Sequence, residues 1–498
     1  MSTGRLRLVV GLACTAVLTS TQTLHAEEDR VVDQLLNILR QNKQISDQQY
    51  RALKQKADDE RQQDLHKAAA LPPPTPSASP AVVAVAPPPP SPAPDSFRAY
   101  FKNGFVLESA DGNFRFAPIV LTQVDWNVSD PSSPVKDVFH LDGTSTGVEF
   151  RRARLGFTGL VFGNIDFKFE YDFAQNSGGQ PAFKDVYMGM NKIPFVQYIR
   201  VGYFKEPFSL DEQTPDTYTT FMERALPNAF AQPDRNTGFA VYQNYFDQRM
   251  LFAAGGFRLT NNFGNGFGSD SPYDVTARLT GLPMYEIGED LIHLGFSYSH
   301  KFRHYSPDSQ ETLAYASRPE SHLFPVNLVN TGNVNTNGAD LLDPEIAWVH
   351  GPFSAQGEYM WTLVDQSNLQ CSGSPPKCTT VGLSNPSFGG GYIEFSYFLT
   401  GESRSSFYDV RKGAFDRVVP INSFTIDGTH WGAWQVAARY SYLNLDSAKV
   451  HGGALDDITG GVNWYLNGVT RISVNYIWAH RESVGDSNIV QGRFQLAF

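Results

Sequence analysis

The sequence predicts an all-β fold: a transmembrane antiparallel β-barrel of about 16 strands, preceded by a short helical or coiled-coil segment and a proline-rich linker. Three observations predict it. From residue 97 onward, segments of nine to eleven residues alternate apolar and polar side chains. Aromatic residues make up 13% of the 498 residues, against 18% charged residues. The last strand-like segment ends on an aromatic residue, Phe498. Long two-faced strands of this kind are typical of outer-membrane barrels.

The overall composition excludes several other classes of protein. A formal net charge of -11 argues against a nucleic-acid partner. Hydrophobic residues at 41% are too few for a bundle of membrane-spanning helices. Three cysteines cannot build a disulfide-stapled scaffold. The sequence offers no metal-binding or cofactor-binding motif, so we expect neither.

Residues 1–26 are interpreted as a secretory signal peptide. Arg5 and Arg7 precede an apolar run over 8–18, and Ala26 supplies the small residue at a cleavage point. The alternative is a lipoprotein signal ending at Cys14, but Gly11 stands where such signals carry leucine. Cleavage would leave a mature chain with 38 basic and 51 acidic residues, a net charge of -13.

The next two segments predict a helical head and a linker. Residues 27–70 place apolar side chains at helical spacing, for example at Leu35, Leu36 and Leu39, but the apolar face is narrow. We therefore expect an oligomeric helical bundle or a short coiled coil. Residues 71–96 hold eleven prolines, which favours an extended linker reaching roughly 75 Å at ~3.1 Å per residue.

Residues 97–498 form the predicted barrel, and its strands are two-faced. From Ile165 to Phe173, five aromatic or aliphatic side chains alternate with Asp, Lys, Glu and Asp without exception. Strands of nine to eleven residues exceed the five or six of soluble sandwiches and match a tilted membrane crossing. In lipid every backbone group must pair, so such a sheet has to close.

The connections between these strands alternate in length. Short turns at 163–164 and 467–468 contrast with long stretches at 129–147 and 366–387, as expected for periplasmic turns and external loops. At about 25 residues per strand and connection, the 402 residues give roughly sixteen strands. A barrel of that size holds an aqueous channel. Cys371 and Cys378 are the only cysteines after the leader, and an exported chain favours a disulfide between them.

Seven segments now carry a resemblance to a known family, the phosphate-selective porin O and P family. They occur in the family's order and read FRRARLG (150–156), FKFEYDF (167–173), RVGYFKEPFS (200–209), FMERALPN (221–228), YFLTGESR (397–404), GAFDRV (413–418, with Pro420) and GVNWYLN (461–467). The resemblance spans 97–498. It implies a sixteen-stranded, homotrimeric outer-membrane porin whose third loop folds inward at the constriction.

The resemblance also implies which residues guide an anion through the pore. Oxyanions need positive charge and hydrogen-bond donors in place of water. The pore candidates are Arg151, Arg152, Arg154, Arg200, Lys205, Glu212 and Arg224. Strand alternation points Arg152 and Arg154 into the lumen, whereas Arg151 would need a bulge or a strand end to turn inward.

This sequence departs from the family pattern at positions that matter for phosphate. Glu212 stands where the resemblance implies a phosphate-holding lysine in selective members. The stretch 305–340, arginine-rich in those members, carries only Arg318. Residues 97–498 hold 30 basic and 41 acidic residues once the leader (2 basic) and residues 27–96 (8 basic, 10 acidic) are set aside. The balance argues against strict phosphate selectivity.

The sequence therefore predicts an outer-membrane porin for passive uptake of small hydrophilic solutes, phosphate or related oxyanions among them. The alternatives are a general porin without phosphate selectivity, and an envelope tether whose head at 27–70 contacts peptidoglycan or another partner in the periplasm. We do not expect an enzyme: the G-x-S-x-G match at 143–147 lacks the strand–turn–helix setting that this motif requires.

Overall fold

The structure is a computed structural model, and it describes residues 96–174, 181–232, 234–267, 272–306, 311–373, 376–382 and 384–498, together with Lys54. The predicted signal peptide, head and linker lie outside the described residues. The chain divides into two compact units, at 1–89 and 90–498. In the described part of the chain, no helix is long and apolar enough to cross a membrane.

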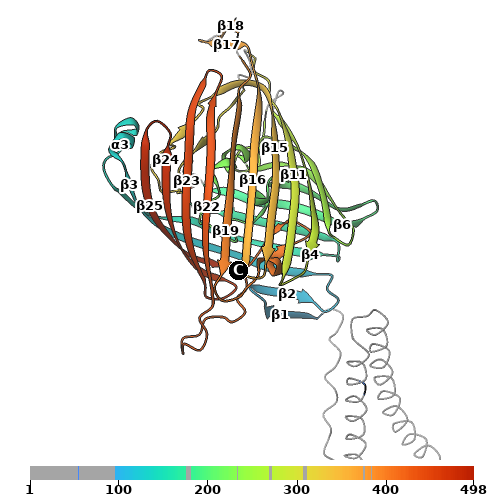
Figure 1. The fold of residues 1–498 in the computed structure, drawn as a ribbon. Coiled ribbons are helices and arrows are strands. Elements are labelled where there is room, and N and C mark those ends of the chain that lie inside the picture. The colour runs from blue at the N-terminus through green and yellow to red at the C-terminus, as the bar shows by residue number, and fades with distance from the viewer. Residues whose placement is uncertain are drawn as a thin grey trace, which may run out of the picture. The chain divides into compact units, whose positions relative to one another are not determined.

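Sixteen antiparallel strands form a closed barrel, as the sequence predicts (Figure 1). Each strand pairs with the next, and the last strand pairs with the first from Ser487↔Pro131 to Ala497↔Leu121. The barrel strands are β3 (Arg115–Pro131), β4 (Ser145–Val161), β5 (Ile165–Asp172), β6 (Ala182–Ile193), β7 (Val196–Lys205), β8 (Arg235–Tyr245), β9 (Met250–Arg258), β10 (Tyr273–Tyr285), β11 (Asp290–Phe302), β15 (Val334–His350), β16 (Phe353–Gln366), β19 (Ser387–Phe398), β22 (Ala433–Ser447), β23 (Val450–Tyr465), β24 (Thr470–Arg481) and β25 (Gly485–Ala497).

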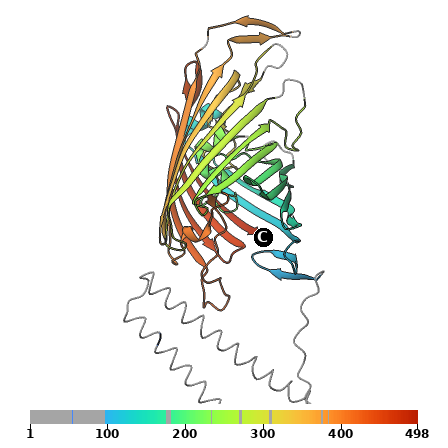
Figure 2. The ribbon, with the colours of Figure 1, turned by 90° about the vertical axis from the view of Figure 1, so that its right-hand side faces the viewer.

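Burial along the strands is the inverse of that in a soluble protein. On β16, the apolar residues Trp361 and Leu363 are exposed on the outside, whereas Glu358 and Thr362 are buried on the inside. The same alternation on the other strands gives the barrel an apolar outer wall and a polar inner wall. Such a surface suits lipid outside and water inside. The strands are tilted around the barrel (Figure 2).

Several smaller elements lie outside the sixteen barrel strands. A hairpin of β1 (Phe97–Phe101) and β2 (Phe105–Ser109) extends the sheet beside β3. At the other end, the hairpin of β17 (Leu369–Ser372) and β18 (Lys377–Thr380) projects beyond the barrel, and the structure joins Cys371 and Cys378 there in a disulfide (Figure 1). The remaining elements are α3 (Ser133–Phe139), α4 (Leu210–Gln213), β12 (Thr312–Leu313), β13 (Ala316–Ser317), β14 (Val329–Asn330), β20 (Tyr408–Asp409), β21 (Ala414–Phe415), and the 3-10 helices η1 (Leu226–Ala231) and η2 (Arg404–Phe407).

Turn lengths follow the expected asymmetry with three exceptions: one long connection at the end that holds the C-terminus, and the short connections 448–449 and 482–484 at the other end. At the end of the barrel that holds the C-terminus, the connections 162–164, 194–195, 246–249, 286–289, 351–352 and 466–469 are short. The connection between β19 and β22 at this same end is residues 399–432, which we call the returning segment. The expectation of a short turn at this end was wrong for this connection. The returning segment packs Tyr408 and Phe415 against inward-facing residues of β10, β11 and β15.

Candidate functional site

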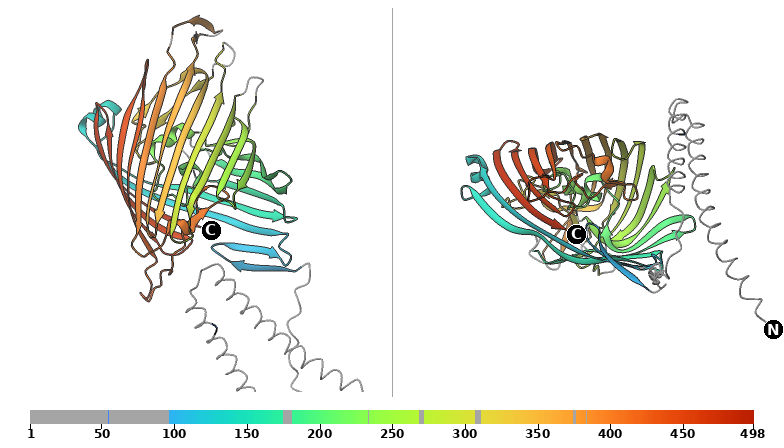
Figure 3. Two further views of the ribbon diagram at one scale, coloured as in Figure 1. Left: turned by 45° about the vertical axis from the view of Figure 1, so that its right-hand side comes forward. Right: turned by 90° about the horizontal axis from the view of Figure 1, so that it is seen from below.

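The connection between β7 and β8, residues 206–234, lies inside the barrel, and we call it the third loop (Figure 3). Its backbone is fixed to the wall on several sides. The N–H of Leu210 donates to Glu358 Oε2 on β16 (2.9 Å). The side chains of Asn463 on β23 and Arg471 on β24 donate to the carbonyls of Thr220 (2.8 Å) and Thr219 (2.7 Å). These attachments run from β16 round to β24, so the loop crosses the lumen.

Local sequence explains how the loop turns inward. Ser209 adopts a positive φ of 66°, and its hydroxyl accepts the N–H of Glu212 at 3.1 Å, which caps the single turn α4. Pro227 stands at the start of η1, where its missing N–H costs no hydrogen bond. The two short helices are joined by 214–225, which carries Asp216, Glu223 and Arg224.

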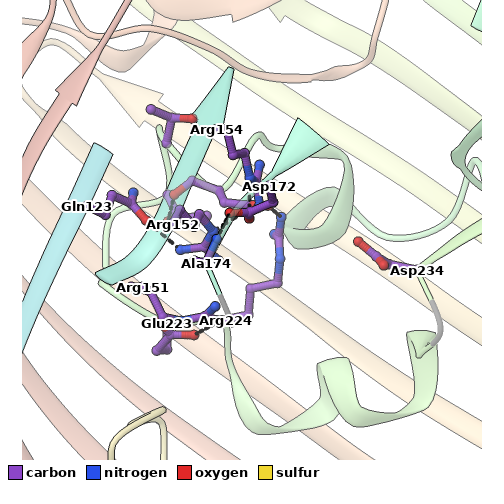
Figure 4. Close-up of polar contacts among 12 residues, drawn as sticks. Gln123, Arg151, Arg152, Arg154, Asp172, Ala174, Glu223, Arg224 and Asp234 are labelled. Carbon is purple, nitrogen blue, oxygen red and sulfur yellow. Dashed lines mark hydrogen bonds and ion pairs between the residues drawn. The ribbon is translucent and has the colours of Figure 1, made fainter. Parts of the chain in front are cut away.

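Arg151 reaches the third loop through a bulge. The register of β3 and β4 pairs Gln123 with Arg152 and Val124 with Phe150, so Arg151 is the extra residue of the bulged strand. Its guanidinium then forms a bidentate pair with Glu223 of the third loop, at 2.9 and 3.0 Å (Figure 4).

Arg152 and Arg154 point into the lumen by ordinary strand alternation, and both reach Asp216 of the third loop. The ion-pair distances to Asp216 Oδ2 are 3.0 Å from Arg152 and 2.8 Å from Arg154. Arg154 also pairs with Asp172 on β5 at 2.8 Å (Figure 4). The two arginines therefore bind the loop to the wall, and their charges are compensated by carboxylates.

Lys205, Glu212 and Arg224 complete this cluster. Glu212 lies 2.6 Å from Lys205 and 3.2 Å from Arg224, and Arg224 reaches Asp216 at 3.0 Å. Burial on its own would raise the pKa of Asp216, but the surrounding arginines and Lys205 hold that pKa well below its usual range. For Glu212 the effect of burial is larger than that of its two cationic neighbours, Arg224 and Lys205, so its pKa is raised. Within this cluster, Asp216 is therefore strongly held in its charged form and Glu212 is not.

Arg200 is separate from this cluster. Its guanidinium lies over the ring of Tyr187 at 4.2 Å and near Tyr242 at 5.2 Å, and its Nε donates to the hydroxyl of Tyr198 at 3.2 Å. These aromatic contacts on β6, β7 and β8 make it a packed cation of the wall, away from the third loop.

Sequence reasoning missed three inward-facing arginines that also hold the third loop. Arg493 on β25 binds Asp125 at 2.6 Å and Glu223 at 2.7 Å. Arg439 on β22 donates to the carbonyl of Glu223 at 3.0 Å, and it pairs with Glu320. The third is Arg471, described above.

A signal in the sequence could have found Arg493. Phe494, Leu496 and Phe498 place an apolar side chain at every second position of the last strand. Alternation puts Arg493 on the opposite face of that strand, which is the face toward the lumen.

Lys184 on β6 is a further inward cation that the sequence analysis did not single out. A register shift between Phe169 and Tyr171 on β5 lies opposite Lys184 and Asp185. Asp185 pairs with Arg235 at 2.9 Å, but Lys184 has no ion pair among the residues that the structure describes. The charged groups that act on it are Arg154, Arg235, Asp234 and Asp216, yet neither carboxylate is paired with it in the described part of the chain.

A second loop, residues 303–333, also enters the barrel, with 307–310 outside the described residues. Its Glu320 accepts from Thr459 at 2.6 Å, and the carbonyl of Glu320 accepts from Gln491 at 3.0 Å. Phe324 and Leu328 are buried in the main apolar cluster of the lumen. The family resemblance implies arginines in this stretch. In this chain the stretch contributes a carboxylate, that of Glu320, to the interior.

The site as a whole is a cluster of paired charges where the third loop meets the barrel wall. Each of five candidate cations has at least one carboxylate within ion-pair distance: Arg151, Arg152, Arg154, Lys205 and Arg224. Paired guanidinium groups keep few donors for a passing anion. The arrangement can shape a narrow, polar path, but it does not present an unpaired ladder of positive charge.

Known proteins resemble this chain in sequence. The sequence model of the family described as "Phosphate-selective porin O and P" matches residues 128–498. The chain is 24% identical to Porin O of Pseudomonas aeruginosa over 424 residues, covering 78% of this chain and 88% of that protein. It is 29% identical to an uncharacterized protein of Caulobacter vibrioides over 67% of this chain, and the match spans 63% of that relative's length.

Solved structures are similar at low sequence identity. An anion-selective porin from Comamonas acidovorans matches with a TM-score of 0.47 and 11% identity, over 77% of this chain and all of that one. OprB of Pseudomonas putida, in its high-pH structure, matches with a TM-score of 0.48 and 9% identity, over 78% of this chain and 95% of that one.

Proposed function

Because the chain belongs to the phosphate-selective porin O and P family, we propose that it is an outer-membrane porin that passes small hydrophilic solutes passively down their gradients. One observation carries the proposal: a closed barrel of sixteen strands has an apolar outer wall and a loop across its polar interior. Closure satisfies every backbone group in lipid, and a barrel of this size encloses an aqueous path.

Assembly and placement follow from the same proposal. We place the barrel in the bacterial outer membrane, in contact with lipid along its apolar wall, and residues 27–96 in the periplasm. The homotrimer implied by the family resemblance is part of the proposal. A chain built this way acts as a channel and not as an enzyme.

The solute class is a separate question. The family's description names phosphate, and that supports oxyanions as solutes. The pairing of Arg152 and Arg154 with Asp216 argues for weak selectivity, because a carboxylate already occupies the donors that an oxyanion would use. We propose a porin that admits small polar and anionic solutes without strong retention of phosphate.

Strict phosphate selectivity is the second candidate, and Lys184 favours it. Its ammonium lies on the inner wall without an ion pair in the described part of the chain, so it can meet an oxyanion without displacing a carboxylate. A tethering role for residues 27–70 is a third candidate from a different class. Deletion of 27–96 tests it: conductance should persist, and a loss of envelope integrity would support the tether.

Single-channel recording in a planar bilayer tests the proposal. A salt gradient gives the reversal potential, and added phosphate gives block of the chloride current. We expect open channels with weak ion selectivity and shallow phosphate block. Strong block at low phosphate concentration, lost in Lys184→Gln, would replace weak selectivity with phosphate selectivity. Folded protein that never conducts would contradict the porin itself.

A further inference from the structure

Three carboxylates meet on the inner wall, away from the arginine cluster. Asp343 and Glu345 lie on β15, and Glu358 lies opposite Glu345 on β16. One carboxylate oxygen from each residue lies within 4.8 Å of those from the other two. All three residues are buried, with Asp343 at 0% exposure. The strands that carry them pair with each other in the barrel, so the fold holds the three groups together.

Positive charge near this group is scarce. Arg278 on β10 pairs with Glu345 at 2.8 Å, and its other nitrogens donate to the carbonyls of Lys412 and Gly413 in the returning segment. His293 lies 3.3 Å from the same oxygen of Glu345 and shares its other ring nitrogen with the hydroxyl of Tyr408. Within the described residues, therefore, one arginine faces three carboxylates.

The carboxylate oxygens of the three residues differ in the hydrogen bonds that they accept. Glu358 accepts from the backbone N–H of Leu210, from that of Asp211, and from the hydroxyl of Tyr392 at 2.5 Å. In contrast, neither oxygen of Asp343 nor Oε2 of Glu345 accepts from a nitrogen or hydroxyl donor among the described residues, and the hydrogen-bonding neighbour of Asp343 is another acid, Glu358. A fully buried carboxylate without partners is costly, so its charge has to be compensated.

We propose that Asp343, Glu345 and Glu358 bind a divalent cation, and that Ca²⁺ is the ion they suit. The ligands are all carboxylate oxygens, which hard cations prefer. Calcium binds oxygen at about 2.3–2.6 Å, so oxygens about 4.6–5.2 Å apart can share one ion. The three oxygens lie within 4.8 Å of one another, so they can converge on one such ion. Magnesium usually keeps several waters and is bound by one or two carboxylates, so a buried group of three carboxylates favours calcium.

The site has a consequence for the third loop. Glu358 holds the first two N–H groups of α4, so it anchors the loop to the wall. An ion bound by Glu358 and its two neighbours fixes that carboxylate in place. Calcium should therefore stabilise the loop in its inward position, whichever solute the channel carries.

Calorimetric titration of the full-length, detergent-folded and chelator-treated protein with CaCl2 tests the site. The wild type should show a site whose affinity falls roughly tenfold or more in Asp343→Asn. Asp457→Asn is the matched control, because Asp457 on β23 is also fully buried with both oxygens unpartnered. It should leave calcium binding unchanged. Glu289→Gln should also leave it unchanged, since Glu289 belongs to a separate acidic group on an exposed turn.

Three results would overturn the proposal: no calcium binding at millimolar concentration, equal binding in Asp343→Asn, or loss of binding in Glu289→Gln instead. The first would mean that protons, not metal, compensate the carboxylates. If Asp343→Asn fails to fold, terbium luminescence of the wild type decides the question. Tyr392 lies against Glu358, so bound Tb³⁺ should emit on tyrosine excitation and lose emission when CaCl2 is added. Absence of that emission would equally overturn the site.

Discussion

The two sides of the lumen differ in how their buried charges are compensated. On the side of β4 and β25, Arg151 and Arg493 both meet Glu223 of the third loop, and Arg493 also meets Asp125. On the side of β15 and β16, three carboxylates share one arginine. The strands on both sides have the same alternation, so the backbone does not create the difference. The side chains do: β15 and β16 themselves carry the three carboxylates, whereas on the other side the third loop supplies Asp216 and Glu223 to the arginines. The loop therefore decides how much positive charge the channel presents.

We call the side of β4 and β25 the arginine side. The largest effect is expected from removing Asp216, the acid that pairs with four cations there. Asp216→Asn leaves Arg152, Arg154, Lys205 and Arg224 with one carboxylate fewer. We expect the reversal potential to shift toward anion selectivity and phosphate block to deepen. We also expect a loss of about 5 kcal/mol in the free energy of unfolding, the upper end for a broken buried pair. Bilayer recording and denaturant unfolding measure the two effects.

The control for this variant is Asp137→Asn, which removes the same charge from the exposed surface of α3. It should leave selectivity and stability within error of the wild type. If Asp137→Asn shifts the reversal potential as much as Asp216→Asn, the total charge of the channel matters and the third loop does not.

A smaller loss in the free energy of unfolding is expected when a cation is removed in place of a carboxylate. Arg493→Gln leaves Asp125 and Glu223 buried beside one cation fewer, at a cost of about 3 kcal/mol. Arg98→Gln breaks a pair with Glu108 at the surface and should change the free energy of unfolding little or not at all. Urea unfolding of both variants compares them directly. Equal losses would show that burial inside the barrel does not strengthen the arginine-side pairs.

The pH dependence of stability should have opposite signs at two acids of the same loop. Burial alone would raise the pKa of Glu223, but Arg151, Arg493 and Arg152 hold it well below its ordinary value of 4.5. Its contribution is therefore complete above pH 4.5 and is lost as pH falls through the lower folded pKa. Burial raises the pKa of Glu212 above 4.5, so its contribution is present below pH 4.5 and is lost as pH rises through the folded pKa.

Two variants measure these signs. Relative to the wild type, Glu223→Gln should lose stability as pH rises from acid toward 4.5 and then stay level. Glu212→Gln should gain relative stability as pH rises above 4.5. Unfolding free energies across a pH series give both curves. Parallel curves for the two variants would mean that the loop does not distinguish its two acids.

The barrel was predictable because its signals are local. Strict alternation in 165–173 and turn residues at 467–468 require only neighbours in sequence, and such alternation indicated the inward faces of Arg152 and Arg154. The strand count followed from the length of the region, 402 residues at about 25 per strand and connection. The meeting of Arg493 with Glu223, 270 residues away, depends on barrel closure and on the path of a loop. No local pattern encodes either. The returning segment was missed because nothing in its composition marks a long connection that re-enters the barrel.

The smallest effect on conduction is expected from a change in the β17–β18 hairpin, which belongs to neither side of the lumen. Cys371→Ser with Cys378→Ser opens the disulfide of the β17–β18 hairpin, which projects beyond the barrel end (Figure 1). A disulfide acts by restricting its own short loop, and this hairpin holds none of the charged groups of either side. Conductance, reversal potential and phosphate block should therefore match those of the wild type in bilayer recordings, while protease cleavage within 369–380 becomes faster. A changed reversal potential would extend the charge-setting part of the channel to this outer hairpin, and the third loop would no longer account for selectivity alone.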